Sequence, residues 1–355
     1  MKGLLLAGGH GTRLRPLTFT GNKHLLTIAN KPMILYGLEH LKNAGVTDIA
    51  VVLGPTKEGI VELLGDGSDF GVRVSYIDQP EPKGIAHAVR LAEGYMEGEP
   101  FVTYLGDNLL KQGAKGFVER FGQSGADCVI GVCAVKDPSR YGVVEMEAGK
   151  VTRAVEKPKH PRSNLALVGV YVFGPAVFEA VGRIGPSPRG ELEITDAIQW
   201  LIDSGAKVEA QEVTGWWKDT GTVEDLVEAN RLVLDDLEHR VSGAIEDESN
   251  VHGRVSTGLN SVIKRGAEVR GPVVIGSGSV VNEGVYVGPY TSIGNNVALR
   301  SGEVENSMIM DGCTIDTSER IVDSLIGPNS TVSSLGSARP KGKRLVVGAQ
   351  STVEF

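Results

Sequence analysis

Aliphatic runs alternate with amphipathic segments over the first part of the chain. The runs, which are typical of buried strands, lie at residues 4–7, 48–53, 72–77 and 101–105. The segments between them place their apolar residues on one helical face and lie at residues 31–41, 57–64 and 85–96. This alternation predicts a parallel sheet that helices cover on both faces. In such sheets, ligands bind at the carboxyl ends of the strands.

The pattern changes at Tyr141, where strand-like runs follow one another with no helix between them. They lie at residues 141–147, 151–155 and 168–173. These runs predict a mixed or antiparallel extension of the sheet, able to wall a pocket. The further expected elements are a helix at 192–204, a strand at 207–213 that returns to the sheet, and a long amphipathic helix at 223–237.

The last third of the chain is periodic. The polar, acidic segment Arg240–Asn250 that precedes it predicts a linker. Aliphatic residues then recur every six positions at Val269, Ile275, Val281, Val287, Ile293 and Leu299, and after a reset of phase at Ile309, Ile315 and Ile321. Val347 and Val353 repeat the six-residue step near the end of the chain. A six-residue repeat of this type is the signature of a parallel β-helix, in which each triangular coil takes about three repeats.

Length, charge and hydropathy narrow the class of protein. A chain of 355 residues is long for one core, so we expect two domains, at residues 1–240 and 241–355. The net charge of −8 and the scattered lysines and arginines argue against nucleic acid as a partner, because backbone binding needs a basic face. No apolar run approaches the roughly 18–20 residues that span a bilayer, so we expect no membrane partner and a cytoplasmic location.

The three cysteines show no metal-ligand spacing. Cys128 and Cys133 lie in one apolar run at an odd separation, which places them on opposite faces of a strand and prevents a bond between them. With Cys313 they are expected to be buried thiols in a reducing compartment.

The loop that leaves the first strand carries candidate chemistry. The stretch Leu5–Thr18 runs from aliphatic residues into Gly8, Gly9 and Gly11, and then into arginines and turn residues. A bare backbone can approach phosphate oxygens closely and point its N–H groups at them. A dinucleotide-binding loop would need a further glycine where Leu14 stands, so the pattern predicts a polyphosphate site of another kind.

The same stretch resembles the opening signature of the sugar-nucleotide pyrophosphorylases, the nucleotidyltransferases of sugar 1-phosphates. Further motifs of this family follow in order: Lys23, Lys31-Pro32, Leu105-Gly106-Asp107-Asn108, Glu156-Lys157-Pro158, Arg189–Asp196 and Trp217–Gly221. The likeness covers the first 240 residues and is closest to the long-form glucose-1-phosphate thymidylyltransferase branch. It implies a Rossmann-like, mostly parallel α/β sheet followed by a left-handed β-helix, in an enzyme that feeds deoxysugar or polysaccharide synthesis.

The resemblance implies transfer of a thymidylyl group from dTTP to α-D-glucose 1-phosphate, with release of pyrophosphate. The acceptor phosphate titrates near pH 6 and is already a dianionic nucleophile at neutral pH, so the reaction requires no general base. It requires charge neutralisation and in-line positioning, for which Arg13 and Lys23 are the candidate cations. Relatives usually carry glutamine after this lysine, where His24 stands here.

The family also implies residues for the nucleotide and for a metal ion. The implied nucleotide-binding residues are Leu6, Gly8, Gly9, Gly11, Thr12, Gln79 and Gly84. Asp107 and Asp219 are the implied ligands of Mg²⁺. The amide of Gln79 offers an acceptor and a donor side by side, which complement N3–H and O4 of thymine or uracil. The resemblance assigns neither Gln79 nor Gly84 to the 5-methyl group, so UTP is an alternative to dTTP.

Lys157 is the implied catalytic holder of the sugar phosphate, with Arg189 as a second cation. The other implied sugar-phosphate-binding residues are Asn108, Gly142, Glu156, Val168 and Tyr171. Trp217 is expected either to stack near the substrate or to pack in the core.

Other functions stay open on the sequence alone. One is a UTP- or GTP-using enzyme; guanylyltransferases share the opening and the β-helix but normally lack the Leu-Gly-Asp-Asn string. Another is a regulatory subunit without turnover, although such proteins usually lose the loop arginine, the lysine or a metal aspartate. Acetyl transfer by the β-helix would need a catalytic histidine, and residues 241–355 contain only His252. We therefore expect the β-helix to serve regulation or assembly into a homo-oligomer.

Overall fold

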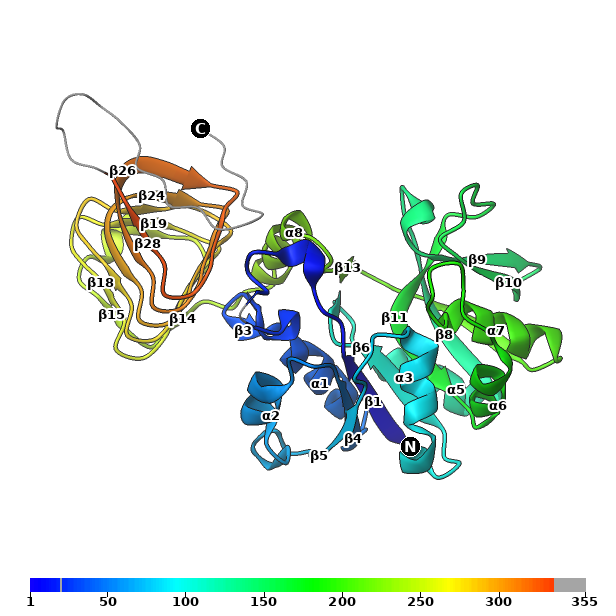
Figure 1. Ribbon diagram of the computed structural model, residues 1–355. Helices are drawn as coiled ribbons and strands as arrows, with labels where there is room; N and C mark the ends of the chain where they lie inside the picture. Colours follow the sequence, from blue (N-terminus) through cyan, green and yellow to red (C-terminus); the bar gives the residue numbers. More distant parts are fainter. Residues whose placement is uncertain (20, 335–355) are drawn as a thin grey trace. The chain divides into compact units, whose positions relative to one another are not determined.

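The computed structural model describes residues 1–19 and 21–334, which divide into two units (Figure 1). The first unit comprises Met1–Gly11, Gly21–Leu25 and Met33–Asp219. The second comprises the signature loop from Thr12, the segment Leu26–Pro32 and the chain from Thr220 onward. Within the described residues, no helix is long and apolar enough to cross a membrane.

A nine-stranded sheet forms the centre of the first unit. Its main path runs β10-β9-β11-β6-β1-β4-β5, and β8 joins β11 to β12. These strands are β1 (Lys2–Ala7), β4 (Asp48–Leu53), β5 (Arg73–Asp78), β6 (Phe101–Leu105), β8 (Cys128–Ala134), β9 (Gly142–Glu147), β10 (Lys150–Glu156), β11 (Leu165–Phe173) and β12 (Val208–Glu212). Strands β6, β1, β4 and β5 pair in parallel, whereas β11, β9 and β10 pair antiparallel. The predicted parallel sheet and its antiparallel extension are therefore confirmed.

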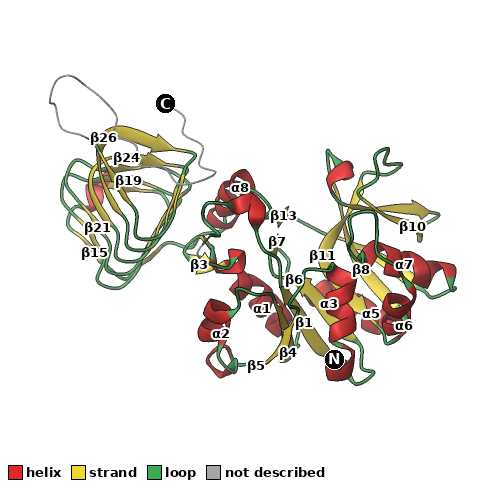
Figure 2. Ribbon diagram, in the orientation of Figure 1, coloured by secondary structure: helices red, strands yellow, loops and turns green. Residues whose placement is uncertain are grey.

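Helices cover both faces of this sheet (Figure 2). The side chains of β1 alternate, so that Leu4 and Leu6 enter one buried cluster while Leu5 and Ala7 enter the other. The first cluster is completed by α3 (Ile85–Leu91), α4 (Glu93–Met96), α6 (Ala176–Arg183) and α7 (Ile194–Asp203). The second cluster is completed by α1 (Met33–Asn43), α2 (Glu58–Leu64) and α5 (Lys115–Ser124). The helix predicted at 85–96 is divided at Ala92 into α3 and α4.

Two short ribbons complete the helix and strand inventory before the periodic region. Strand β7 (Asn108–Leu110) pairs antiparallel with β13 (Trp217–Asp219) in the first unit. Strand β2 (Thr27–Ile28) pairs with β3 (Lys31–Pro32) in the second. Helix α8 (Val223–Leu234) begins with a capping box, in which Thr222 and Asp225 bond each other's backbone N–H groups.

The periodic region consists of parallel sheets made of short strands. They are β14 (Arg240–Val241), β15 (Ala244–Ile245), β16 (Val251–His252), β17 (Val255–Thr257), β18 (Val262–Ile263), β19 (Glu268–Arg270), β20 (Val273–Ile275), β21 (Val280–Val281), β22 (Tyr286–Val287), β23 (Thr291–Ile293), β24 (Ala298–Glu305), β25 (Met308–Ile309), β26 (Thr314–Val322), β27 (Leu325–Ile326) and β28 (Thr331–Ser333). Val269 pairs with Val251 and with Val287, each eighteen positions away. Three six-residue repeats therefore separate stacked strands, as the periodicity predicts.

The register explains the reset of phase in the repeat. Ile275 pairs with Ile293 eighteen positions later, but Ile293 pairs with Ile309, only sixteen positions later. The repeat residues from Val269 to Ile315 are buried in one apolar cluster, and Ile321 packs against it. Val347 and Val353, which continue the pattern, lie outside the described residues.

The linker predicted at Arg240–Asn250 is wrong. Strands β14 and β15 lie within it and pair in parallel with β17 and β18, so the stacked strands already begin there. Ile245 packs against the apolar cluster, whereas Val241 is 42% exposed. The prediction failed because strands of two residues contain few apolar side chains, so the segment has the polar composition of a linker.

A buried asparagine fastens α8 to the strands of the second unit. The side chain of Asn230 is fully buried. Its Oδ1 accepts hydrogen bonds from the backbone N–H of Ala29 and from Oγ of Ser292, each at 2.9 Å. Its Nδ2 donates to the backbone oxygen of Tyr290 at 3.1 Å. One side chain therefore satisfies polar groups from β23, its preceding turn and the β2–β3 ribbon.

We expect Asn230→Ala to lower the free energy of unfolding by about 2–4 kcal/mol, because it leaves buried polar groups without partners. Denaturant unfolding followed by circular dichroism measures this loss. The matched control is Glu224→Gln on the exposed side of the same helix. Equal midpoints for the two variants would contradict the role assigned to Asn230.

Candidate active site

Two consecutive glycines follow β1, and each faces a candidate functional side chain. A Cβ atom on Gly8 would lie 2.7 Å from Oε1 of Gln79 and a Cβ on Gly9 would lie 3.1 Å from Cε of Lys23. A Cβ on Gly54, after β4, would lie 2.5 Å from the backbone oxygen of Gly8. The carboxyl edge of the parallel strands thus carries candidate residues only because the backbone there is bare.

Lys23 and Asp107 form an ion pair at this edge. Their side chains are only 13% and 18% exposed. Burial acts to raise the pKa of Asp107, but its polar neighbours, Lys23 foremost and Asn108 among them, together outweigh burial and hold that pKa below its usual range. The adjacent His24 is buried, bonds Oδ1 of Asn22 through Nδ1 at 2.7 Å, and has its pKa lowered to about 3 by burial and by Lys23. His24 is therefore neutral at physiological pH and contributes no charge here.

The second candidate carboxylate, Asp219, lies near Asp107 because its strand, β13, pairs with β7. In the β7–β13 pairing, Asp219 lies opposite Asn108, the residue that follows Asp107. Asn108 is buried, and its Nδ2 donates to Oδ1 of Asp107 at 3.0 Å. Its Oδ1 accepts from the backbone N–H of Gly169 at 3.1 Å and from Nε1 of Trp217 at 2.6 Å. Asn108 therefore orients Asp107.

The carboxylates of Asp107 and Asp219 fit a magnesium ion. Within the described residues, no group of three or more histidines, cysteines or acidic residues could hold a metal by itself. Mg²⁺ is usually bound through one or two carboxylates, with waters and substrate phosphates supplying the other oxygens. Asp107 and Asp219 provide that number of carboxylates on neighbouring strand positions.

Gln79 and Gly84 form a second corner, after β5. The backbone N–H of Gln79 bonds the oxygen of Leu53, and its side chain is only 5% exposed. Nε2 of Gln79 contacts the backbone oxygen of Gly84 at 3.2 Å and Nδ1 of His87 at 3.0 Å. Gly84 has a φ of 98°, and a Cβ on it would lie 2.4 Å from the oxygen of Leu192, so only glycine fits.

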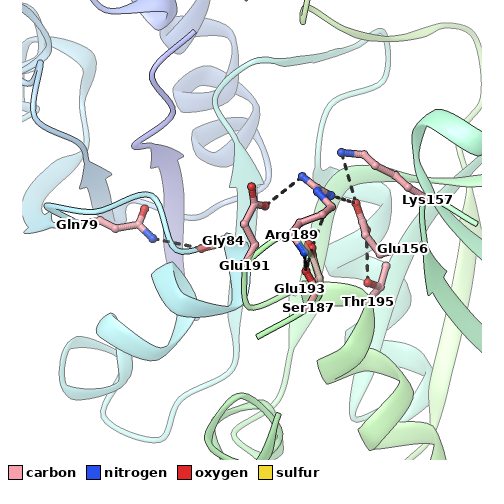
Figure 3. Close-up of polar contacts among 9 residues, drawn as sticks. All are labelled: Gln79, Gly84, Glu156, Lys157, Ser187, Arg189, Glu191, Glu193 and Thr195. Carbon is pink, nitrogen blue, oxygen red and sulfur yellow. Dashed lines mark hydrogen bonds and ion pairs between the residues drawn. The ribbon is translucent and has the colours of Figure 1, made fainter. Parts of the chain in front are cut away.

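A third corner gathers the candidate acceptor residues around Glu156 (Figure 3). Nζ of Lys157 lies 3.6 Å and Nη1 of Arg189 lies 3.1 Å from Oε1 of Glu156. Arg189 also pairs with Glu191 at 3.2 Å and with Glu193 at 3.6 Å. Two cations and three carboxylates therefore meet at the antiparallel extension of the sheet.

The local backbone fixes the direction of these side chains. Lys157 has a φ of 40°, and its N–H bonds the oxygen of Tyr141 at 3.0 Å. A Cβ on Gly142, which lies opposite Glu156 in the β9–β10 pairing, would meet Thr195 Cγ2 at 2.7 Å. Burial and the neighbouring Glu193 raise the pKa of Glu156, against the opposing effects of Lys157 and Arg189. Three carboxylates share two cations here, so one negative charge is not fully balanced.

Two expected pocket-wall residues lie in the core. Val168 is fully buried and Tyr171 is 3% exposed. A Cβ on Gly131 would lie 2.2 Å from Cγ2 of Val168, which shows how closely that side chain is packed. Val168 belongs to one apolar cluster and Tyr171 to the other, and the roles expected of them at the sugar stay predictions. Trp217 packs edge-on against Tyr141, with ring centroids 5.2 Å apart.

The start of the signature loop divides between the units. Leu6 is 8% exposed in β1, and Gly11 has a φ of 61°. Thr12 and Arg13 belong to a short 3₁₀ helix in the second unit. There, atoms of the Arg13 guanidinium lie 3.1–3.2 Å from where a Cβ on Gly221 would be.

Three residues that contact candidate site residues were given no role from the sequence: His87, Glu191 and Glu193. A histidine one turn after Gly84 was a signal for the first, and the acidic residues within Arg189–Asp196 were a signal for the others. The cysteine predictions are confirmed in part, because all three are free but Cys133 is only half-buried.

We expect Glu156→Gln to change the pH dependence of stability. Because the folded-state pKa of Glu156 is raised, its stabilising contribution is full below the unfolded-state value and is lost as pH rises through the folded value. The free energy of unfolding of the variant, relative to the wild type, should therefore increase as the pH rises above about 4.5, the ordinary pKa of a glutamate. Denaturant unfolding at several pH values measures this, with the exposed Glu179→Gln as control. A difference that falls over this range would contradict the burial effect.

Comparison with family models and curated proteins agrees with this geometry. Residues 2–236 match the model described as nucleotidyl transferase, and residues 269–354 match the GMPPB C-terminal domain. The chain is 49% identical to the low-salt glycan biosynthesis nucleotidyltransferase Agl11 of Haloferax volcanii, over 100% of both chains. It is 45% identical to a glucose-1-phosphate thymidylyltransferase of Streptomyces griseus, over 100% of this chain and 99% of that one.

A solved structure is similar to the first part of the chain. It is a putative glucose-1-phosphate thymidylyltransferase from Bacillus anthracis in complex with a sucrose. The match has a TM-score of 0.63 and 38% identity, and it covers 68% of this chain and 97% of that one. The Rossmann-like sheet expected from the sequence is confirmed, and the chain belongs to the nucleotidyl transferase family.

Proposed function

We propose that this protein transfers a thymidylyl group from dTTP to α-D-glucose 1-phosphate, giving dTDP-glucose and pyrophosphate. The observation that carries the proposal is the full-length match to the Streptomyces thymidylyltransferase, joined to a corner where Lys157 and Arg189 converge on Glu156. A sugar phosphate carries one phosphate for the two cations and several hydroxyls for a carboxylate to accept from.

The proposed reaction is an in-line displacement at the α-phosphorus. Lys157 and Arg189 hold the dianionic sugar phosphate, whose oxygen attacks without a general base. A new bond joins this oxygen to the α-phosphorus, and the bond to the bridging oxygen of the β-phosphate breaks with inversion. Pyrophosphate leaves with that electron pair, and Lys23 and Arg13 are the cations that would offset its charge.

Asp107 and Asp219 would hold Mg²⁺, which supplies charge neutralisation at phosphate oxygens. Lys23 balances the charge of Asp107 through their ion pair. Asn108 keeps Asp107 in one orientation through its Nδ2. The neutral His24 beside this pair packs against Gly106, where a Cβ would lie 3.0 Å from its ring, and takes no proton in the reaction.

UTP is the alternative nucleotide, because uracil carries the same N3–H and O4 as thymine and differs from it only in the 5-methyl group. A GTP-using enzyme and a regulatory subunit without turnover are further alternatives. All four residues that such subunits usually lose, Arg13, Lys23, Asp107 and Asp219, are present here.

The remaining organisation is also proposed. We infer a catalytic domain at residues 1–240 and a left-handed β-helix at 241–355, supported by the eighteen-residue parallel register. We also propose that the protein is a cytoplasmic homo-oligomer and that its β-helix serves assembly or regulation. The free cysteines agree with a reducing compartment.

A matrix of nucleoside triphosphates against sugar 1-phosphates tests the proposal, with pyrophosphate release as the readout. We expect dTTP with glucose 1-phosphate to give the highest kcat/KM and UTP to follow. A clear preference for GTP, or no turnover of any pair with Mg²⁺ present, would overturn the proposed function.

We expect Lys157→Met to raise the KM for glucose 1-phosphate by about tenfold or more, since charge-assisted bonds to phosphate contribute roughly 1.5–3 kcal/mol. The KM for dTTP should change much less. Lys159→Met, on the same loop and exposed, is the matched control. Parallel changes in both variants would show that loop charge, and not the position of Lys157, matters.

A further inference from the structure

The side-chain amide of Gln79 is held in one orientation by the protein. The backbone oxygen of Gly84 can only accept, so the amide atom 3.2 Å from it must be the donor Nε2. The φ of 98° at Gly84 and its close approach to Leu192 fix the direction of that oxygen. The reverse orientation would place two oxygens against each other.

His87 engages the same nitrogen. Its Nδ1 lies 3.0 Å from Nε2 of Gln79 and accepts the second amide hydrogen. This requires the neutral tautomer of His87 with its hydrogen on the other ring nitrogen. Burial lowers the pKa of His87, and so do Arg90 and Lys83, against a smaller opposing effect of Glu81. The neutral, accepting state is therefore favoured at neutral pH.

Both hydrogens of the Gln79 amide are thus used within the protein. Only Oε1 remains, and among the described residues it accepts no hydrogen bond. It lies over Gly8, where any side chain would displace it. The amide presents a single acceptor, and not the acceptor–donor pair that the sequence suggested.

We propose that His87 is a positioning residue for base selection, which fixes Gln79 so that Oε1 alone meets the base. This inference rests on the proposed function and names the chemistry of its nucleotide specificity. The site takes a pyrimidine whose N3 carries a hydrogen, as thymine and uracil do. It rejects cytosine, because the N3 lone pair of cytosine would face the lone pairs of Oε1.

Without His87, only the hydrogen bond to Gly84 still holds the amide, and the second hydrogen of Nε2 is free to donate to N3 of cytosine. The selectivity for an N3–H base should then fall, whereas the affinity for the phosphates should not. If His87 had only a structural role, its loss would lower kcat/KM for both nucleotides by the same factor.

The test compares kcat/KM for dUTP and dCTP, which differ only at ring positions 3 and 4, with glucose 1-phosphate as acceptor. We expect His87→Leu to reduce the preference for dUTP by about tenfold, in line with the roughly 1–3 kcal/mol of one base-edge mismatch. His87→Gln, which can again offer an acceptor, should recover most of the preference. Leu91→Ala, at an exposed position on the same helix, should leave it unchanged.

The outcomes separate this inference from the proposed function. If the wild type turns over dTTP but His87→Leu keeps the wild-type preference within about twofold, the inference is overturned and the proposed function stands. If thermal melting shows that His87→Leu does not fold, the ratio in His87→Ala, which also lacks an acceptor, decides in its place. A wild type inactive with dTTP overturns both.

Discussion

The bare backbone after β1 is the constraint on which the candidate site depends. Gly8 and Gly9 lie where the parallel strands end, and each leaves room for one side chain from a distant part of the chain. Gln79 fills the first space and Lys23 the second. A side chain at either glycine would displace Gln79 or Lys23, to which we assign the base and the phosphates, so a substitution in the loop would also change the proposed site.

Charge pairing maintains the site without substrate. Lys23 is paired with Asp107, and Arg189 is shared among Glu156, Glu191 and Glu193. Buried or half-buried charges of this kind are costly unless they are paired. Incoming phosphates would replace carboxylates as partners of the cations, so binding exchanges one set of ion pairs for another instead of neutralising exposed charge.

The periodic part of the second unit is stabilised by the same contact repeated from strand to strand. Its aliphatic repeat residues stack on equivalent residues of the next strand, and each new strand extends the same apolar cluster. Polar residues such as Asn230 appear where this regular surface must meet α8, because irregular junctions leave backbone groups that need partners.

The sequence by itself determined the two architectures and most of the candidate site. Hydrophobic period fixes which residues face a core, so the parallel sheet, its antiparallel extension and the six-residue repeat could be predicted. Local motifs named Asp107 and Lys157 as candidates for the site. Only the tertiary structure decided how these groups act on one another. The orientation of the Gln79 amide depends on His87 and Leu192, and the burial of Val168 depends on packing against Gly131. The stacked strands within Arg240–Asn250 were hidden because two-residue strands gain their stability from neighbours eighteen positions away, and no local pattern records that contact.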